Sequence, residues 1–208
     1  MYPEILTNKK GALFDLDGVL IDSETLYTEF WKVTGRKYGI VSDTFAYDIK
    51  GTTLKDILST HFDVAVHPAL IREIHDFEDT MVYPVFDGVR EFLALLDANN
   101  IKKAIVTSSD NTKMGYLFEQ QPWMKDAFDA IITGSMVVNS KPDPEGYLLA
   151  AEKLGLKAED CCVFEDSLQG LEAGKRSGAT VVALATTNSA DKLQGKADLV
   201  ISSFRELL

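Results

Sequence analysis

Apolar residues along the chain fall into short runs that alternate with longer amphipathic segments. The runs are rich in β-branched and aromatic residues, and the first four end at a polar or glycine-containing turn, which is typical of strands buried on both faces. We expect six strands, at residues 11–14, 104–106, 130–132, 162–164, 180–184 and 198–201. Helical patterns lie between them, at residues 89–98, 113–120, 144–154 and 168–177. This alternation predicts a parallel sheet with helices on both faces.

The segment from about residue 21 to residue 81 breaks the alternation, because it reads as helical and contains no clear strand. Its apolar positions form helical stripes at Leu26, Phe30 and Val33, and further along at Ile57, Leu58 and Phe62. We therefore predict an α/β fold with a Rossmann-like core made of residues 1–19 and 82–208. A small helical-bundle cap, residues 20–81, is inserted after the first strand.

Charge and cysteine usage narrow the possible partners. The formal net charge of -11 repels nucleic-acid backbones and anionic lipids, so we expect neither nucleic acid nor a membrane as partner. The only cysteines, Cys161 and Cys162, are adjacent in an apolar run, where side chains alternate between faces and a disulfide is hard to form. The two cysteines are therefore expected to be buried free thiols in a reducing compartment.

The N-terminus lacks the apolar region of a signal peptide, and we expect a cytoplasmic protein.

Polar residues that can carry chemistry follow the predicted strands. They are Asp15 and Asp17 after the first strand, Thr107, Ser108 and Ser109 after the second, Lys141 in the loop after the third, and Glu165 with Asp166 after the fourth. In open parallel sheets ligands bind at the carboxyl ends of the strands, so we expect these side chains to meet. Carboxylates for a hard cation, donors for phosphate oxygens and one lysine together predict a metal-assisted phosphate site.

Asp15 and Asp17 are two residues apart, so in extended backbone they project to the same side, and Gly18 permits a tight turn after them. One carboxylate can bind or attack while the other handles a proton. A carboxylate attacks phosphorus only when the repulsion between anions is neutralised, which Mg²⁺ and Lys141 would supply. Thr107 and Ser108 precede a helix whose N-terminus could hold a phosphate.

Structural roles compete with this interpretation. An aspartate pair at a turn is often only a solvated loop, and Lys141 by itself would be a surface lysine before a helix that begins with proline. Asp166 also suits the N-cap of the following helix. We expect His61, His67 and His75 to be ordinary surface histidines, and Tyr27, Phe30 and Trp31 to belong to the core of the insertion.

The order of these motifs resembles the haloacid dehalogenase superfamily of phosphohydrolases, in particular its β-phosphoglucomutase-like branch. The matching residues are Asp15 to Glu24 (DLDGVLIDSE), Thr107 with Ser108, Lys141 in KPDPEGY, and Glu165 with Asp166. The resemblance implies that Asp15 is the nucleophile and Asp17 the general acid and base. It implies Mg²⁺ bound by Asp15, Asp17 through its carbonyl, and Asp166, with Glu165 as a ligand or a neighbour of the ligands. Thr107, Ser108 and Lys141 would hold the phosphate.

The chain departs from the sugar phosphomutases of this branch. They carry a histidine where this chain has Tyr27, an arginine shortly after the glycine that matches Gly51, and a lysine where this chain has Asp110. These departures favour a phosphatase that hydrolyses a small phosphorylated metabolite through an aspartyl-phosphate. A phosphohexomutase is the alternative, and a non-catalytic phosphate-binding or regulatory protein is a third possibility.

Substrate selection would depend on the helical insertion. The candidates to contact the substrate are Gly51, Thr52, Thr53 and Asn111, together with Lys50 and Lys55. We expect a monomer or a weak homo-oligomer.

Overall fold

The computed structural model describes residues 3–208, and its centre is a six-stranded sheet in which all paired strands are parallel. The strands are β1 (Gly11–Phe14), β2 (Lys102–Val106), β3 (Ala130–Ile132), β4 (Cys161–Glu165), β5 (Thr180–Leu184) and β6 (Leu199–Ile201). They lie in the order β3-β2-β1-β4-β5-β6. The predicted α/β fold with a parallel sheet is confirmed, and each predicted strand is present within two residues of its expected bounds.

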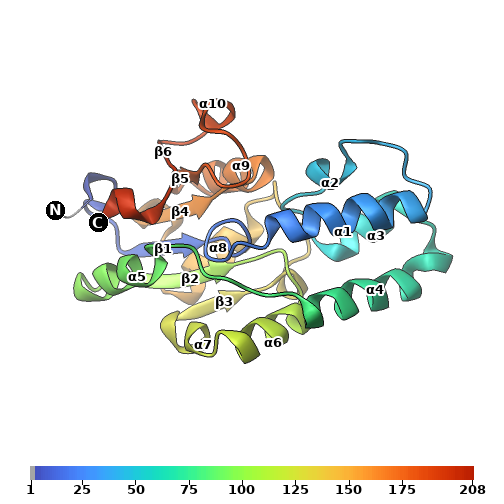
Figure 1. The fold of residues 1–208 in the computed structure, drawn as a ribbon. Coiled ribbons are helices and arrows are strands. Elements are labelled where there is room, and N and C mark those ends of the chain that lie inside the picture. Colours follow the sequence, from blue (N-terminus) through green and yellow to red (C-terminus); the bar gives the residue numbers. More distant parts are fainter. Residues whose placement is uncertain (1–2) are drawn as a thin grey trace.

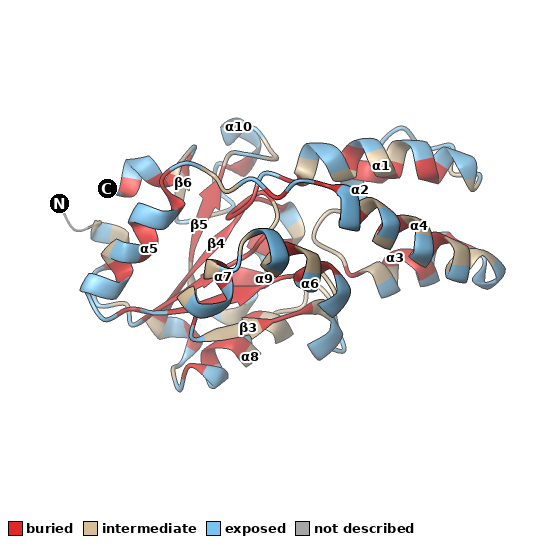
Figure 2. Cartoon of the chain, turned by 60° about the horizontal axis from the view of Figure 1, so that its bottom comes forward, coloured by how far each residue is buried: buried red, intermediate tan, exposed pale blue. Residues whose placement is uncertain are grey.

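Helices cover both faces of this sheet (Figures 1 and 2). Their bounds are α5 (Val89–Ala98), α6 (Asn111–Gln120), α7 (Trp123–Ala127), α8 (Glu145–Lys153), α9 (Leu168–Ser177) and α10 (Ala190–Leu193). Phe14 and Phe164 point to the face covered by α5 and α6, whereas Leu13 and Val163 point to the face covered by α8 and α9. The near-continuous apolar strands therefore follow from burial on two sides.

A helical insertion follows the first strand and lies beside one end of the sheet (Figure 1). It contains α1 (Glu24–Lys37), α2 (Phe45–Asp48), α3 (Leu54–His61) and α4 (His67–Thr80). These helices pack around their own hydrophobic cluster, in which Trp31, Phe45 and Phe62 stack edge to face or tilted. The insertion thus has a core separate from those of the two sheet faces.

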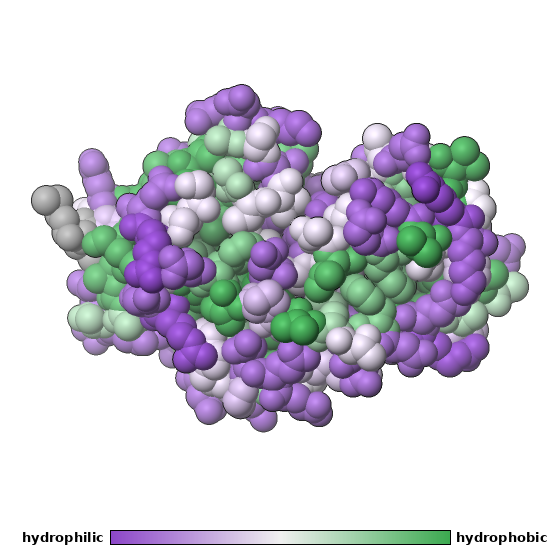
Figure 3. Space-filling view, viewed as in Figure 1, coloured by the Kyte–Doolittle hydropathy of each residue, from purple (hydrophilic) through white to green (hydrophobic). Residues whose placement is uncertain are grey.

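The buried side of α1 differs from the predicted stripe. Leu26 and Val33 are exposed, and α1 instead buries Trp31 together with Thr28, Thr34 and Gly35. A side chain on Gly35 would press on the ring of Phe45, so the glycine is needed for close packing of α2. Counting apolar residues along the sequence misses this buried face of α1, because small and hydroxyl-bearing residues occupy it. Figure 3 shows hydrophobic side chains over the region of α1 and α4, within a hydrophilic rim.

Cys161 and Cys162 are buried free thiols on opposite faces of the sheet, as predicted. Burial raises the pKa of Cys161 to about 11 and that of Cys162 to about 12, so both are unreactive thiols near neutral pH. Across residues 3–208, no helix has the length and apolar character that crossing a bilayer requires.

Four phenylalanines, Phe14, Phe92, Phe164 and Phe204, form the aromatic centre of one sheet face, with ring centroids of the Phe14–Phe164 and Phe92–Phe204 pairs 4.7 and 4.9 Å apart. Because Phe92 is fully buried, Phe92→Ala should lower the free energy of unfolding by about 3–5 kcal/mol. Urea denaturation measures this loss. Val33→Ala removes an exposed side chain and should change stability by less than about 0.5 kcal/mol. Equal effects of the two substitutions would contradict the assigned core.

Candidate active site

The predicted site residues meet at the carboxyl edge of the sheet because β1 lies between β2 and β4. Asp15 directly follows β1, Thr107 follows β2, and Glu165 is the last residue of β4. In the sheet, Phe14 is level with both Ile105 and Phe164, so the three strands end side by side. From β1 the strand order runs to β2 and β3 on one side, and then continues with β4 on the other side of β1. Open α/β sheets bind ligands at such a reversal of the strand order.

Lys141 is buried at the centre of this edge. Its Nζ atom lies 2.6 Å from Asp15 Oδ1, 2.5 Å from Glu165 Oε1 and 3.3 Å from the carbonyl oxygen of Val106. The surface-lysine alternative is therefore wrong, since Lys141 is only 7% exposed. Its two anionic partners raise its pKa above the ordinary range despite burial, so it remains an ammonium.

Glu165 has both carboxylate oxygens engaged. Oε1 accepts from Lys141 and from the Tyr147 hydroxyl at 3.0 Å. Oε2 accepts from the backbone N–H groups of Asp166 and Ser167, both at 2.9 Å, and from the Ser167 hydroxyl at 3.0 Å. These contacts fix the carboxylate and aim Lys141 at Asp15.

Asp166 lies beside Glu165, but it does not cap the following helix. Ser167 is the N-cap of α9, where its hydroxyl accepts from the Gly170 N–H at 3.0 Å. The capping role considered for Asp166 is thus wrong. Its Oδ1 atom is buried and accepts no hydrogen bond from residues 3–208. An unpaired buried carboxylate oxygen is costly, and it suits a ligand that the protein chain itself does not provide.

The buried carboxylates around Lys141 lie close enough together to hold a cation. One ligand oxygen from each of Asp15, Glu165 and Asp166 lies within 4.8 Å of the others. Burial raises the pKa of Asp15 to about 8 and that of Asp166 well above its usual value, with the neighbouring carboxylates adding to the effect. A bound dication would favour the ionised form of both groups. The residues present therefore fit a divalent metal ion.

Asp17 lies on the turn after Asp15, where a glycine is required. Gly18 has φ of +77°, and a Cβ atom there would lie 2.1 Å from the Asp166 carboxylate. Asp17 Oδ1 accepts a hydrogen bond from the Ser23 hydroxyl, and Oδ2 accepts from the Ser109 hydroxyl at 3.1 Å and from Lys113 Nζ at 2.5 Å. The carboxylate is held in one orientation by three donors.

Lys113 is a site residue that the sequence reasoning missed. It is buried, and besides its ion pair with Asp17 its ammonium lies 4.4 Å from the ring centroid of Tyr27. Lys113 is in the first turn of α6, and helical side chains lean toward the helix N-terminus. A lysine in the first turn after the Thr107-Ser108-Ser109 segment was the signal that could have revealed it.

A cavity opens on this edge between the sheet and the helical insertion. Among the strand-end residues and substrate candidates predicted above, those that line it are Asp15, Asp17, Thr107, Ser108, Ser109, Asp166, Gly51, Thr52 and Lys50. Ser108 donates its hydroxyl to the Gly51 carbonyl oxygen at 2.7 Å, which joins the two parts of the chain. Lys50 is ion-paired with Glu24 inside the cavity.

Three of the proposed substrate residues, Thr53, Lys55 and Asn111, do not line that cavity. The Thr53 hydroxyl caps α3 and bonds to Asp56, and Asn111 accepts from the Thr133 hydroxyl at 2.9 Å. Lys55 is exposed. Tyr27 and Trp31, by contrast, pack in the insertion and also line the cavity.

The histidine prediction is wrong for His75. Its Nε2 atom lies 3.1 Å from Asp110 Oδ2, across the junction between the insertion and the sheet. Asp110 caps α6 directly after the second-strand motif, so His75 is close to a strand end in space although it is distant in sequence. His61 is exposed, as expected.

Comparison with known proteins agrees with this geometry. The family model described as haloacid dehalogenase-like hydrolase matches residues 12–184, which is most of the chain. The chain belongs to this family. It is 32% identical to validoxylamine A 7'-phosphate phosphatase of Streptomyces hygroscopicus subsp. limoneus over 95% of both chains. It is 30% identical to a phosphorylated carbohydrates phosphatase of Thermotoga maritima, over 81% of this chain and 82% of the relative.

A solved haloacid dehalogenase-like relative shares the architecture. The crystal structure of β-phosphoglucomutase from Clostridium difficile superposes with a TM-score of 0.81 at 26% identity, covering 96% of this chain and 93% of the relative. The predicted family membership is thereby confirmed. The chain is a phosphatase- or phosphomutase-like member of a family whose enzymes generally use a divalent metal ion, and its buried acidic cluster is in keeping with that.

Gly170 of α9 tests how tightly the Glu165 carboxylate is held. A Cβ atom at Gly170 would lie 1.7 Å from Glu165 Oε1, which cannot move without losing its donors. Gly170→Ala should therefore lower the free energy of unfolding by about 1–3 kcal/mol. Gly115→Ala, in α6, meets open space and should raise stability by about 0.5–1 kcal/mol. Urea denaturation of both variants measures the contrast, and a neutral Gly170→Ala would show that Glu165 is free to shift.

Proposed function

We propose that this protein is a Mg²⁺-dependent phosphatase that hydrolyses a small phosphorylated metabolite, such as a sugar phosphate. The observation that carries the proposal is the position of Asp15, whose carboxylate faces a cavity while Lys141 and the acidic cluster lie directly behind it. The phosphatase relatives support the substrate class. Mg²⁺ is the expected metal because the available ligands are carboxylate and carbonyl oxygens.

In the proposed first half-reaction, a carboxylate oxygen of Asp15 attacks the phosphorus atom of the substrate. The bond from phosphorus to the ester oxygen breaks, and Asp17 gives its proton to the departing alcohol. The products of this half are the free alcohol and an aspartyl-phosphate on Asp15. Thr107, Ser108 and Lys141 hold the transferring phosphoryl group, with the N-terminal side of α6 nearby.

In the second half-reaction, Asp17 takes a proton from a water molecule, whose oxygen attacks the same phosphorus atom. The bond between phosphorus and Asp15 breaks, which releases inorganic phosphate and regenerates the carboxylate. When Asp17 is ionised, the donors from Ser23, Ser109 and Lys113 keep its carboxylate aimed at the cavity. Its position two residues after the nucleophile suits an oxygen leaving group that needs a proton.

Mg²⁺ would be held by Asp15, Asp166 and the backbone carbonyl of Asp17, and it would supply positive charge that neutralises phosphate and carboxylate oxygens. Asp166 Oδ1 suits this role because it is buried and has no hydrogen-bond partner among residues 3–208. Glu165 is fully hydrogen-bonded, so we assign it to orienting Lys141 and the loop of Asp166 rather than to direct contact with the ion. Residues 20–81 act as the cap that closes over the substrate.

The nucleophile assignment predicts that Asp15→Asn releases phosphate at least about a thousandfold more slowly than the wild type, because the amide cannot form the aspartyl-phosphate. Phosphate release from a panel of sugar and nucleotide monophosphates with Mg²⁺ measures this, and EDTA should abolish it. Asp126→Asn makes the same chemical change at an exposed position of α7 and should keep full activity. The proposal fails if no substrate turns over, or if Asp15→Asn equals the wild type.

The departures at Tyr27 and Asp110 predict hydrolysis rather than isomerisation. Tyr27 donates its hydroxyl to Glu78 at 2.7 Å and Asp110 contacts His75, so neither position offers a basic group to a second phosphate. Incubation with β-glucose 1-phosphate and a trace of glucose 1,6-bisphosphate should release phosphate, with no more glucose 6-phosphate than hydrolysis of the added bisphosphate can give. A coupled assay for glucose 6-phosphate, run beside phosphate detection, distinguishes the two. Formation of glucose 6-phosphate in amounts well above the bisphosphate added would favour the mutase.

A further inference from the structure

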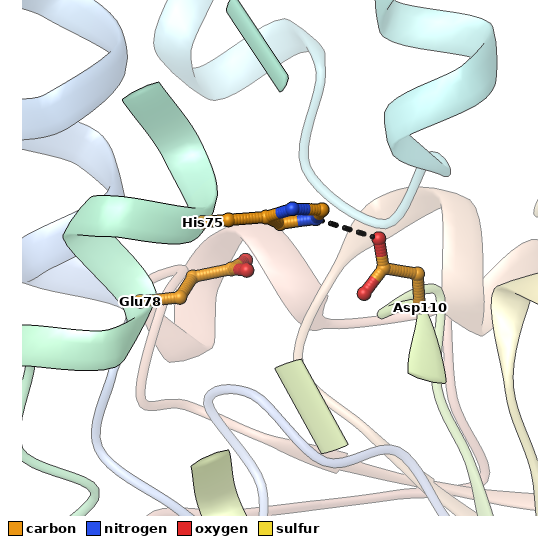
Figure 4. A group of neighbouring side chains, drawn as sticks. All are labelled: His75, Glu78 and Asp110. Atoms are coloured by element: carbon orange, nitrogen blue, oxygen red, sulfur yellow. Dashed lines mark hydrogen bonds and ion pairs between the residues drawn. The ribbon is translucent and has the colours of Figure 1, made fainter. Parts of the chain in front are cut away.

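Three metal-ligating side chains outside the Asp15 cluster meet where the helical insertion touches the sheet (Figure 4). His75 and Glu78 are one turn apart on α4, so they lie on the same side of that helix. Asp110 comes from the other part of the chain, as the N-cap of α6. One ligand atom from each of the three lies within 4.8 Å of the other two.

The protein already uses one oxygen of each carboxylate and leaves the other available. Asp110 Oδ1 accepts from the backbone N–H groups of Thr112 at 2.9 Å and Lys113 at 3.0 Å. Glu78 Oε1 accepts from the Tyr27 hydroxyl at 2.7 Å. The atoms that remain are Asp110 Oδ2, which contacts His75 Nε2, and Glu78 Oε2.

Glu78 Oε2 has no protein partner that would explain its burial. The residue is only 5% exposed, and this oxygen has no hydrogen-bond partner within residues 3–208. Figure 4 shows the carboxylate pointing toward the ring of His75 and the side of Asp110. The charge of Lys113 opposes the rise that burial causes in the pKa of Glu78, but Lys113 is itself ion-paired with Asp17. The two carboxylates share the imidazole of His75, which contacts Asp110 Oδ2, and Glu78 Oε2 is left without a hydrogen-bond partner within residues 3–208.

We propose that His75, Glu78 and Asp110 bind a divalent transition-metal ion of the Zn²⁺ type, at a site separate from the Asp15, Glu165 and Asp166 cluster. An imidazole combined with two carboxylates suits Zn²⁺ better than Mg²⁺, which prefers oxygen ligands alone. Three protein ligands leave a coordination position open, and Glu78 and Asp110 both line the cavity. Because two ligands come from α4 and one from α6, the ion would fasten the insertion to the sheet. This inference does not depend on the proposed reaction.

Calorimetric titration with Zn²⁺ tests the site in the full-length protein, with saturating Mg²⁺ present to occupy the Asp15 cluster. We expect one Zn²⁺ per chain, with affinity reduced about a hundredfold or more in His75→Gln and in Glu78→Gln. Asp166→Asn should retain it. His61→Gln and Asp79→Asn are matched controls, because they change an exposed histidine of the insertion and the exposed acid next to Glu78. Both controls should bind Zn²⁺ like the wild type.

Co²⁺ substitution identifies the ligand types by visible absorption. A spectrum without thiolate charge-transfer bands excludes Cys161 and Cys162 as the ligands, and its loss in His75→Gln assigns the histidine. Circular dichroism in EDTA shows that each variant is folded, and if Glu78→Gln unfolds, His75→Gln decides. The proposal is overturned if no Zn²⁺ binds in the presence of Mg²⁺. It is equally overturned if Zn²⁺ binding is unchanged in folded His75→Gln or Glu78→Gln, or if it disappears in Asp166→Asn.

Discussion

The buried ammonium of Lys141 between Asp15 and Glu165 is the interaction on which the arrangement of the site depends. Removing three charges from water costs several kcal/mol per ion, and only close pairing with further hydrogen bonds offsets that cost. The structure provides both, since Glu165 is surrounded by donors and Lys141 also reaches the Val106 carbonyl. The pairing is possible only because β1 and β4 are neighbours in the sheet and end at the same level. Strand order and site chemistry are therefore linked through one side chain.

The sheet could be predicted from the sequence because two-sided burial leaves a continuous apolar run that polar turns delimit. Residues 11–14 and 180–184, and the helices at 89–98 and 168–177, have the predicted bounds. Helix α1 could not be predicted in the same way. Its buried face contains Thr28, Thr34 and Gly35, whose burial depends on how closely α2 approaches rather than on their own hydrophobicity. Periodicity identified that a helix forms there but assigned the wrong residues to its buried face.

The strand-end residues could be predicted as a group, because parallel strands bring positions that are far apart in the sequence to one edge. That rule places Asp15, Thr107 and Glu165 together and needs no knowledge of loops. It gives no information about contacts between the insertion and the sheet, so the approach of His75 to Asp110 was not foreseen. The position of Lys113 could have been predicted only in part. Side chains of a helix lean toward its N-terminus, and this directs Lys113 back toward Asp17.

The distribution of charge limits how an anionic substrate can be attracted. The two lysines that line the cavity, Lys50 and Lys113, are ion-paired with Glu24 and Asp17, and Lys141 behind it is paired with Asp15. Each of these ammonium groups already has a carboxylate partner, and the whole chain carries a net charge of -11. In the proposed reaction a bound dication would therefore be needed beside Lys141, Thr107 and Ser108 to attract the phosphate, because the Asp110 cap already accepts from the Thr112 and Lys113 N–H groups at the start of α6. With the phosphate held at the sheet as proposed, the carboxylates and hydroxyls of the insertion would discriminate among the groups that carry it.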